Sequence, residues 1–291
     1  MGKLSRFDLI SDIHLDHWIS PVPCGAVQSR KIEKLFSRML PVSPSPVLVI
    51  AGDMGHYNNQ NYLMLEFLKQ YYEHILIVRG NHDLYLVSNQ QRRKFGSSDA
   101  RWEDMKNRAS ALDNLHFLEG TCVTIDGVTF GGTGMWYDFQ YGMQCCGHSL
   151  EQMTAIWQET MNDGRYISGI PDAEEEKRKL ESVLARQPDV IVTHVGPDWT
   201  HAKNRYARGV TKSFYFFDGQ AYLDQCEGKI WCFGHIHEHY TSTRDAGWKT
   251  TRWGIPAILR SPESERFRSG RGTAKERSPQ RALQAEIRLY Q

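Results

Sequence analysis

The chain has 291 residues, a length that can bury a substantial core in one large α/β domain or in two smaller ones. Its 35 basic and 34 acidic residues leave a net charge of only +1, which argues against a general polyanion-binding surface. Asp8 and Asp12 interrupt the apolar residues near the N-terminus too early for a signal-peptide core or a membrane span. We therefore expect a cytoplasmic globular protein that does not bind membranes.

Six short apolar runs predict buried strands, because each ends at once in glycine or polar residues. In chain order they are FDLIS, VLVIAGD, ILIVRGNHD, VTFGGTG, VIVTHVG and IWCFGHIH. Helical periodicity over residues 27–40 and 62–72 separates the first three runs. This alternation of strand and helix predicts an α/β architecture in which helices cover a sheet.

The alternation of predicted strands and helices does not continue through the second half of the chain. Residues 136–175 break the alternation, and we expect them to form an insertion beside the site. The charged run DAEEEKRKLESVLARQ that follows predicts a surface helix. Seven Lys or Arg and three Glu between Arg260 and Arg281 predict a mobile, mildly basic tail. The six cysteines lack the paired spacing of a structural zinc site, so we expect free thiols.

Histidines, carboxylates and an amide follow the predicted strands, at the ends where open α/β sheets bind ligands. The candidates are Asp12, His14, Asp53, Asn81, His82, Asp83, His194, His235 and His237. In an extended segment residues i and i+2 face the same way, so Asp12 with His14, and His235 with His237, should each present two ligand atoms to one point. Imidazole and carboxylate suit Mn²⁺, Fe or Zn²⁺, and a carboxylate can bridge two such ions. The set is large enough for a two-metal site.

The motifs SDIH, GD, GNHD, TH and GHIH, in this order, resemble the calcineurin-like metallophosphoesterase superfamily over roughly residues 7–238. Each motif alone is weak, but five in order at strand ends are a strong signal. The resemblance implies a four-layer αββα sandwich of two mixed β-sheets flanked by helices. It implies a catalytic domain over residues 1–265, followed by the basic tail over residues 266–291. GGTGMWYD and the later MNDGRYI are also similar to a less characterised bacterial-type branch.

The same resemblance implies two sets of metal ligands that share a bridging Asp53. One set is Asp12, His14 and His237, and the other is Asn81, His194 and His235. The resemblance leaves His82 unligated, where it can steady a phosphate oxygen or protonate the leaving oxygen, with Asp83 orienting its ring. We expect two divalent ions, Mn²⁺ first, with Fe, Zn²⁺ or Ni²⁺ as alternatives. Asp16 is a further candidate to orient a ligand, and His56 and His201 are the other histidines with the best claim to a site role.

These features predict a hydrolase that cleaves phosphomonoester or phosphodiester bonds in a small substrate, through hydroxide activated by two metal ions. GDMGHYNN replaces the Arg-containing segment of protein Ser/Thr phosphatases, which disfavours that substrate class. A nuclease whose tail contacts DNA phosphates and a non-catalytic scaffold of the same fold are the alternatives. Four polar residues are candidates for substrate contact: Asn162, Asp163, Arg165 and His239.

Overall fold

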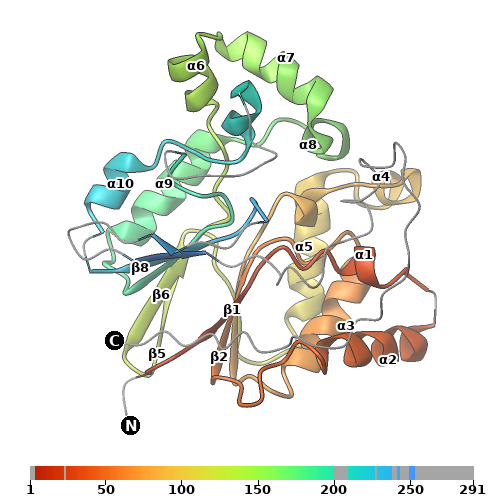
Figure 1. The fold of residues 1–291 in the computed structure, drawn as a ribbon. Helices are drawn as coiled ribbons and strands as arrows, with labels where there is room; N and C mark the ends of the chain where they lie inside the picture. Colours follow the sequence, from red (N-terminus) through yellow and green to blue (C-terminus); the bar gives the residue numbers. More distant parts are fainter. Residues whose placement is uncertain are drawn as a thin grey trace, which may run out of the picture.

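The computed structural model describes residues 4–22, 24–199, 209–226, 228–237, 241–242 and 249–252. Two β-sheets pack face to face, and helices cover their outer faces (Figure 1). The expected α/β sandwich is therefore confirmed. None of the helices within the described residues is long and apolar enough to cross a membrane.

The first sheet is parallel throughout, with strand order β1-β2-β3-β4. Its strands are β1 (Asp8–Ile10), β2 (Val47–Ala51), β3 (His74–Val78) and β4 (Leu115–Phe117). We expected two mixed sheets, and for this sheet the expectation was wrong. Its crossovers are helical, and a helical crossover returns the chain in the same direction.

The second sheet is mixed, with strand order β5-β6-β7-β8-β10-β9. Its strands are β5 (Thr121–Ile125), β6 (Val128–Gly132), β7 (Val190–Val192), β8 (Ile230–Phe233), β9 (Thr241–Ser242) and β10 (Lys249–Arg252). Asp126 and Gly127 join β5 to β6 with φ values of 45° and 75°, as a tight hairpin turn of the Asp-Gly type requires. β6, β7 and β8 run parallel to one another.

Side chains of alternating direction along β2 divide the core into its layers. Val47, Val49 and Ala51 face the second sheet, where they pack with residues such as Phe130 and Val192. Leu48 and Ile50 point the other way and pack with the helices. Both faces of the strand are buried, which explains why its sequence is apolar without interruption.

Helices on the outer side of the first sheet are α1 (Leu15–Trp18), α2 (Gly25–Phe36), α3 (Asn58–Leu68), α4 (Asn89–Phe95) and α5 (Ser98–Ala109), with a short 3₁₀ turn, η1 (His82–Leu84). The expected charged helix is α9 (Ala173–Leu184), which packs on β5 and β6. Near it lies α10 (Gln220–Asp224), whose Tyr222 donates a hydrogen bond to Glu181 at 3.0 Å. The 3₁₀ turn η2 (Gly209–Phe214) packs on residues 140–146 instead.

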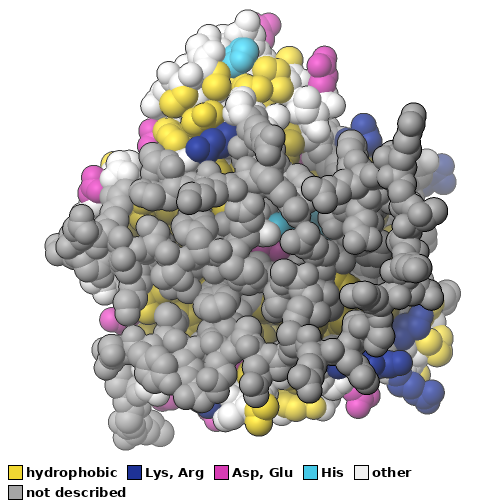
Figure 2. All heavy atoms as spheres, viewed as in Figure 1, with side chains coloured by type: hydrophobic (Ala, Val, Ile, Leu, Met, Phe, Trp, Pro, Cys, Tyr) yellow, Lys and Arg dark blue, Asp and Glu magenta, His cyan; other side chains and the backbone are white. Residues whose placement is uncertain are grey.

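The region expected as an insertion forms three helices, α6 (Gln140–Cys146), α7 (Leu150–Thr160) and α8 (Asn162–Tyr166). They make up the top of the molecule in Figure 1. Figure 2 shows apolar side chains gathered over this part, where Leu150 is exposed. α7 contacts α8, and through α8 the insertion reaches the strand ends.

Candidate metal centre

Tight turns at the strand ends bring the candidate ligands together. Five of the candidates have positive φ angles between 44° and 71°: Asp12, His14, Asp53, His235 and His237. Non-glycine residues adopt this region rarely, and clusters of such residues mark functional sites. Strands β1 and β8 end before these residues, so the expected extended geometry was wrong. The turn after β1 still directs Asp12 and His14 to one group, whereas His235 and His237 belong to different groups.

Two glycines permit the close approach of these turns. A Cβ atom on Gly52 would collide with the ring of His194, and one on Gly80 would collide with the carboxylate and backbone nitrogen of Asp53. The glycines of the GD and GNHD motifs are therefore needed for space. The turns are joined by backbone hydrogen bonds, for example from the nitrogen of His14 to the oxygen of Asp53 at 3.0 Å.

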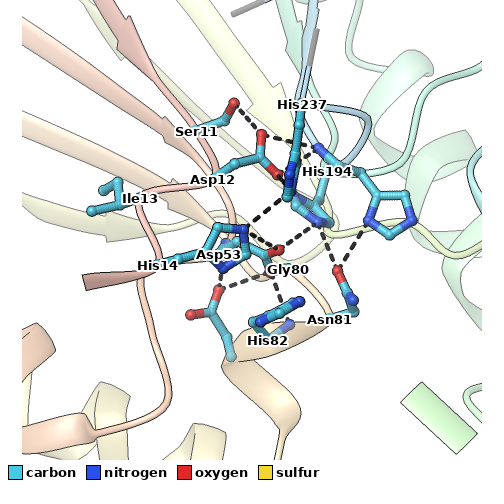
Figure 3. A network of polar contacts seen from close by, with 12 residues as sticks. Ser11, Asp12, Ile13, His14, Asp53, Gly80, Asn81, His82, His194 and His237 are labelled. Atoms are coloured by element: carbon cyan, nitrogen blue, oxygen red, sulfur yellow. Dashed lines mark hydrogen bonds and ion pairs between the residues drawn. The ribbon is translucent and has the colours of Figure 1, made fainter. Parts of the chain in front are cut away.

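The first group of converging side chains is Asp12, His14, Asp53 and His237 (Figure 3). Nε2 of His14 lies 3.1 Å from Nε2 of His237 and 3.7 Å from Oδ2 of Asp53. Nε2 of His237 lies 3.4 Å from Oδ1 of Asp12. The side chain of His237 is 50 % exposed, so the group reaches solvent.

The second group is Asp53, Asn81, His194 and His235. Oδ1 of Asn81 lies 3.0 Å from both Nε2 of His194 and Nδ1 of His235. Oδ2 of Asp53 lies 3.4 Å from Nε2 of His194, so this carboxylate belongs to both groups. The ligand atoms of the first group lie within 4.8 Å of one another. The same limit holds in the second group for the ligand atoms of Asp53, His194 and His235.

Hydrogen bonds at the far side of the rings leave acceptor atoms pointing inward. Nδ1 of His194 donates to the carbonyl oxygen of Ala51 at 2.8 Å, and Nε2 of His235 donates to that of Phe214 at 2.9 Å. The remaining nitrogen of each ring then presents a lone pair to Oδ1 of Asn81, which is itself an acceptor. Such partners on the outer nitrogen are the usual support of metal-bound imidazoles.

Acceptors that face one another across 3.0 Å need a proton or a cation between them. Among the described residues, Oδ2 of Asp53 is also buried without a hydrogen-bond partner, an arrangement that a positive ion would satisfy. The donor set of imidazole, carboxylate and amide oxygen suits Mn²⁺, Fe, Zn²⁺ or Ni²⁺. The residues therefore fit a pair of divalent cations.

The ionisation states of the site also suit bound cations. Burial would raise the pKa of Asp53, but the positive charge of His194 holds it well below its usual range. Burial would lower the pKa of His194, but the carboxylate of Asp53 raises it to about 10. Burial lowers the pKa of His14 to about 3. These shifts keep the carboxylate of Asp53 ionised and hold a proton at His194.

The candidate catalytic His82 begins η1 beside the first group. Its backbone nitrogen donates to Oδ1 of Asp53 at 2.8 Å, and its ring lies 4.3 Å from the ring of His14 between centroids. Nδ1 of His82 lies 2.9 Å from Nε2 of His56. Burial lowers the pKa of His82 well below its usual range.

Asp83 does not orient the ring of His82, and this expectation was wrong. Its carboxylate accepts hydrogen bonds from the backbone nitrogens of Gly80 at 2.8 Å, Asp53 at 2.9 Å and Met54 at 3.0 Å. Burial and the charge of Asp53 raise the pKa of Asp83 to about 6. Asp83 therefore ties the turn after β2 to the turn after β3 and so holds Asp53 in place.

Sequence reasoning missed Arg101, which lies on α5 with 0 % exposure. Its guanidinium donates to the carbonyl oxygens of Gly55 at 2.7 Å, His82 at 3.0 Å and Asp83. Burial lowers its pKa to about 10. No motif surrounds this arginine, and its contacts lie 18 to 46 residues away in the sequence, so no local signal identifies it.

The four expected substrate contacts have different positions. Asp163 is 1 % exposed and accepts hydrogen bonds from Tyr137 at 2.6 Å, from Nδ2 of Asn81 at 2.7 Å and from Tyr85. It therefore lies behind Asn81 and faces no substrate. Asn162 and Arg165 are exposed on α8, and their role stays a prediction. His239, like His201 and the tail, lies outside the described residues.

The fold and the two groups of ligand atoms together define a metal-binding protein built on a two-sheet α/β sandwich. The chain belongs to the calcineurin-like phosphoesterase family, whose model matches residues 5–239. This family consists of metal-dependent phosphoester hydrolases, and the expected family membership is confirmed.

Individual relatives are more distant. UPF0046 protein K07C11.7 from Caenorhabditis elegans is 31 % identical over 127 residues, which cover 42 % of this chain and 42 % of that protein. The chain thus spans less than half the length of this curated relative. Among solved structures, a phosphopantetheinyl hydrolase (PptH) from Mycobacterium tuberculosis is similar with a TM-score of 0.64 at 18 % identity, covering 92 % of this chain and 94 % of that one. A dimetal phosphatase from Danio rerio is similar with a TM-score of 0.46 at 12 % identity, covering 86 % and 87 %.

Proposed function

We propose that the chain hydrolyses phosphomonoester or phosphodiester bonds of a small substrate with two divalent metal ions. The observation that carries this proposal is the position of Asp53, whose carboxylate belongs to both groups of ligand atoms. One ion would take Asp12, His14 and His237, and the other would take Asn81, His194 and His235. When bound, the two cations would lower the pKa of a water molecule and neutralise phosphoryl charge.

The residues of the chain contribute position and proton transfer. The buried hydrogen bonds of Asp83 and Asn81 hold the groups that surround the phosphate before it arrives, which favours a charge-stabilising site. His82 lies beside the first group without a place in either ligand set, and it would donate a proton to the leaving oxygen.

We propose no particular leaving group. The neighbour from Mycobacterium tuberculosis is called a phosphopantetheinyl hydrolase, and 18 % identity relates the two folds alone. The nuclease alternative depends on the basic tail, which lies outside the described residues. The scaffold alternative is disfavoured because the described part of the chain keeps a complete set of candidate ligands.

The test uses the purified full chain with Mn²⁺, Fe²⁺, Zn²⁺ or Ni²⁺ and two substrates, p-nitrophenyl phosphate and its bis ester. Turnover with at least one ion is expected, and the ratio between the two substrates separates phosphatase from phosphodiesterase activity. Asp53→Asn should abolish turnover and lower the metal content by elemental analysis, while Asp99→Asn, at an exposed carboxylate paired with Arg79, should leave both unchanged. A wild-type chain that hydrolyses neither ester with any of these ions would contradict the proposal.

A further inference from the structure

Two side chains in series, His56 and then Asp16, lead away from the ring of His82. Nε2 of His56 lies 2.9 Å from Nδ1 of His82, and Nδ1 of His56 lies 2.7 Å from Oδ2 of Asp16. The planes of the two imidazole rings differ by only 9°, with centroids 5.1 Å apart, as a hydrogen bond in the plane of both rings requires. The other carboxylate oxygen of Asp16 accepts the backbone N–H of His56 at 2.9 Å. Asp16 therefore holds His56 at two points.

The surroundings keep these side chains rigid. The ring of Tyr85 stacks on both His56 and His82, with centroid distances of 5.4 Å and 4.3 Å. The guanidinium of Arg101 holds the backbone on both sides, through the carbonyl oxygens of Gly55 and His82. The side chains of His56 and Asp16 are only 13 % and 8 % exposed. Few other orientations of the two side chains are open to them.

The hydrogen-bond chemistry determines which nitrogen carries each proton. A carboxylate only accepts hydrogen bonds, so Nδ1 of His56 must be the donor toward Asp16. Nε2 of His56 is then the acceptor in the neutral ring, and Nδ1 of His82 is the donor toward it. This assignment leaves Nε2 of His82 as the atom that gains or loses a proton.

We propose that His56 and Asp16 are positioning residues, which hold His82 so that Nε2 delivers its proton to the leaving oxygen. This inference rests on the proposed function. In the step, the Nε2–H bond of His82 breaks while the O–H bond of the leaving alcohol forms, and the electron pair of the broken bond stays on Nε2. His82 is left neutral and regains its proton from water. The hydrogen bonds from His82 to His56 and from His56 to Asp16 hold the ring in one orientation during the transfer.

A third metal ion is the competing interpretation, because ligand atoms of Asp16, His17 and His56 also lie within 4.8 Å of one another. Both ring nitrogens of His56 already lie at hydrogen-bond distance from a protein partner. The positioning role accounts for both contacts, whereas a metal at this place would have to break one of them.

The experiment compares leaving groups of falling acidity in p-nitrophenyl phosphate, phenyl phosphate and an alkyl phosphate. A good leaving group departs without a proton, and a poor one needs it. His56→Phe keeps the ring and removes both nitrogens, and Asp16→Asn keeps the shape and removes the charge. His74→Phe is the matched control, because it breaks a histidine pair of the same kind, His74 to His116 at 3.3 Å, at the start of β3.

We expect His56→Phe and Asp16→Asn to change kcat with p-nitrophenyl phosphate by less than about threefold and to lower kcat with the alkyl phosphate by about 10²-fold, the lower end of what a general acid contributes. The metal content of both variants should match that of the wild type. His74→Phe should lower neither kcat with any of the three substrates nor the metal content. A uniform loss with all three substrates, no loss with any, or a metal content that falls by one ion in His56→Phe would overturn the inference. Failure of the proposed function is distinguishable, because the wild-type chain would then hydrolyse none of the substrates.

Discussion

Asn81 donates a hydrogen bond from its amide nitrogen to the carboxylate of Asp163, 82 residues away, at 2.7 Å. A second donation from the same nitrogen, to the hydroxyl of Tyr85 at 3.3 Å, fixes the amide with its oxygen toward His194 and His235. The helix α8 of the insertion supplies Asp163. The insertion therefore orients one of the candidate metal ligands from behind.

Asp163→Asn should lower the affinity for divalent ions by about 10- to 100-fold, as loss of a group behind a metal ligand typically does. The new amide group would bring its own donors against the hydroxyl groups and the amide nitrogen that now donate to Asp163, and Asn81 would lose its fixed orientation. Isothermal titration calorimetry with Mn²⁺ and Zn²⁺ measures the change. Asp138→Asn is the control, because Asp138 is also buried and lies within the same insertion, but it accepts hydrogen bonds from Gln140 and Asp218 and pairs with Lys177 instead. Equal affinities of the two variants would contradict the prediction.

The sequence predicts the sheets better than it predicts the surroundings of the site. Apolar runs such as residues 47–51 are unambiguous because both faces of the strand are buried. α5 shows no comparable pattern, since its buried residues stand among charged ones, and one of them is Arg101 itself. An arginine turns inward there because loop carbonyl groups far along the chain need donors, and no local pattern records that need.

The candidate ligands could be chosen from the sequence for a similar reason. Asp12 and Asp53 each stand two residues after the end of a strand, so parallel strand order alone brings them to one edge. Asp163 has no such link to a strand, and its place depends on how the insertion packs. The backbone geometry of the site could not be predicted from the sequence either. Positive φ angles usually indicate glycine, but here His14 and His237 adopt them because tertiary contacts hold their turns.

Arg101→Met should lower the free energy of unfolding by about 3 kcal/mol, because carbonyl groups of Gly55, His82 and Asp83 lose a buried charged donor. Urea unfolding with and without metal measures the change. Arg108→Met, on the same helix, removes an exposed pair with Asp104 and should cost less than about 0.5 kcal/mol. Equal midpoints for the two variants would show that the buried arginine does not hold the turns.

Metal binding should weaken as the pH falls, because a proton and a cation compete for Nε2 of His194. The carboxylate of Asp53 outweighs the effect of burial and raises the pKa of His194 to about 10, so the metal-free protein carries this proton at neutral pH. Each ion that binds there must release it, and the apparent Kd should fall about tenfold for each unit of pH rise between pH 6 and 8. Calorimetry at pH 7 in two buffers of different ionisation enthalpy counts the released protons. His194→Gln should bind more weakly and release about one proton fewer, whereas His74→Gln should behave as the wild type. A wild-type chain that releases no proton on binding would show that the pocket does not hold its charge at His194.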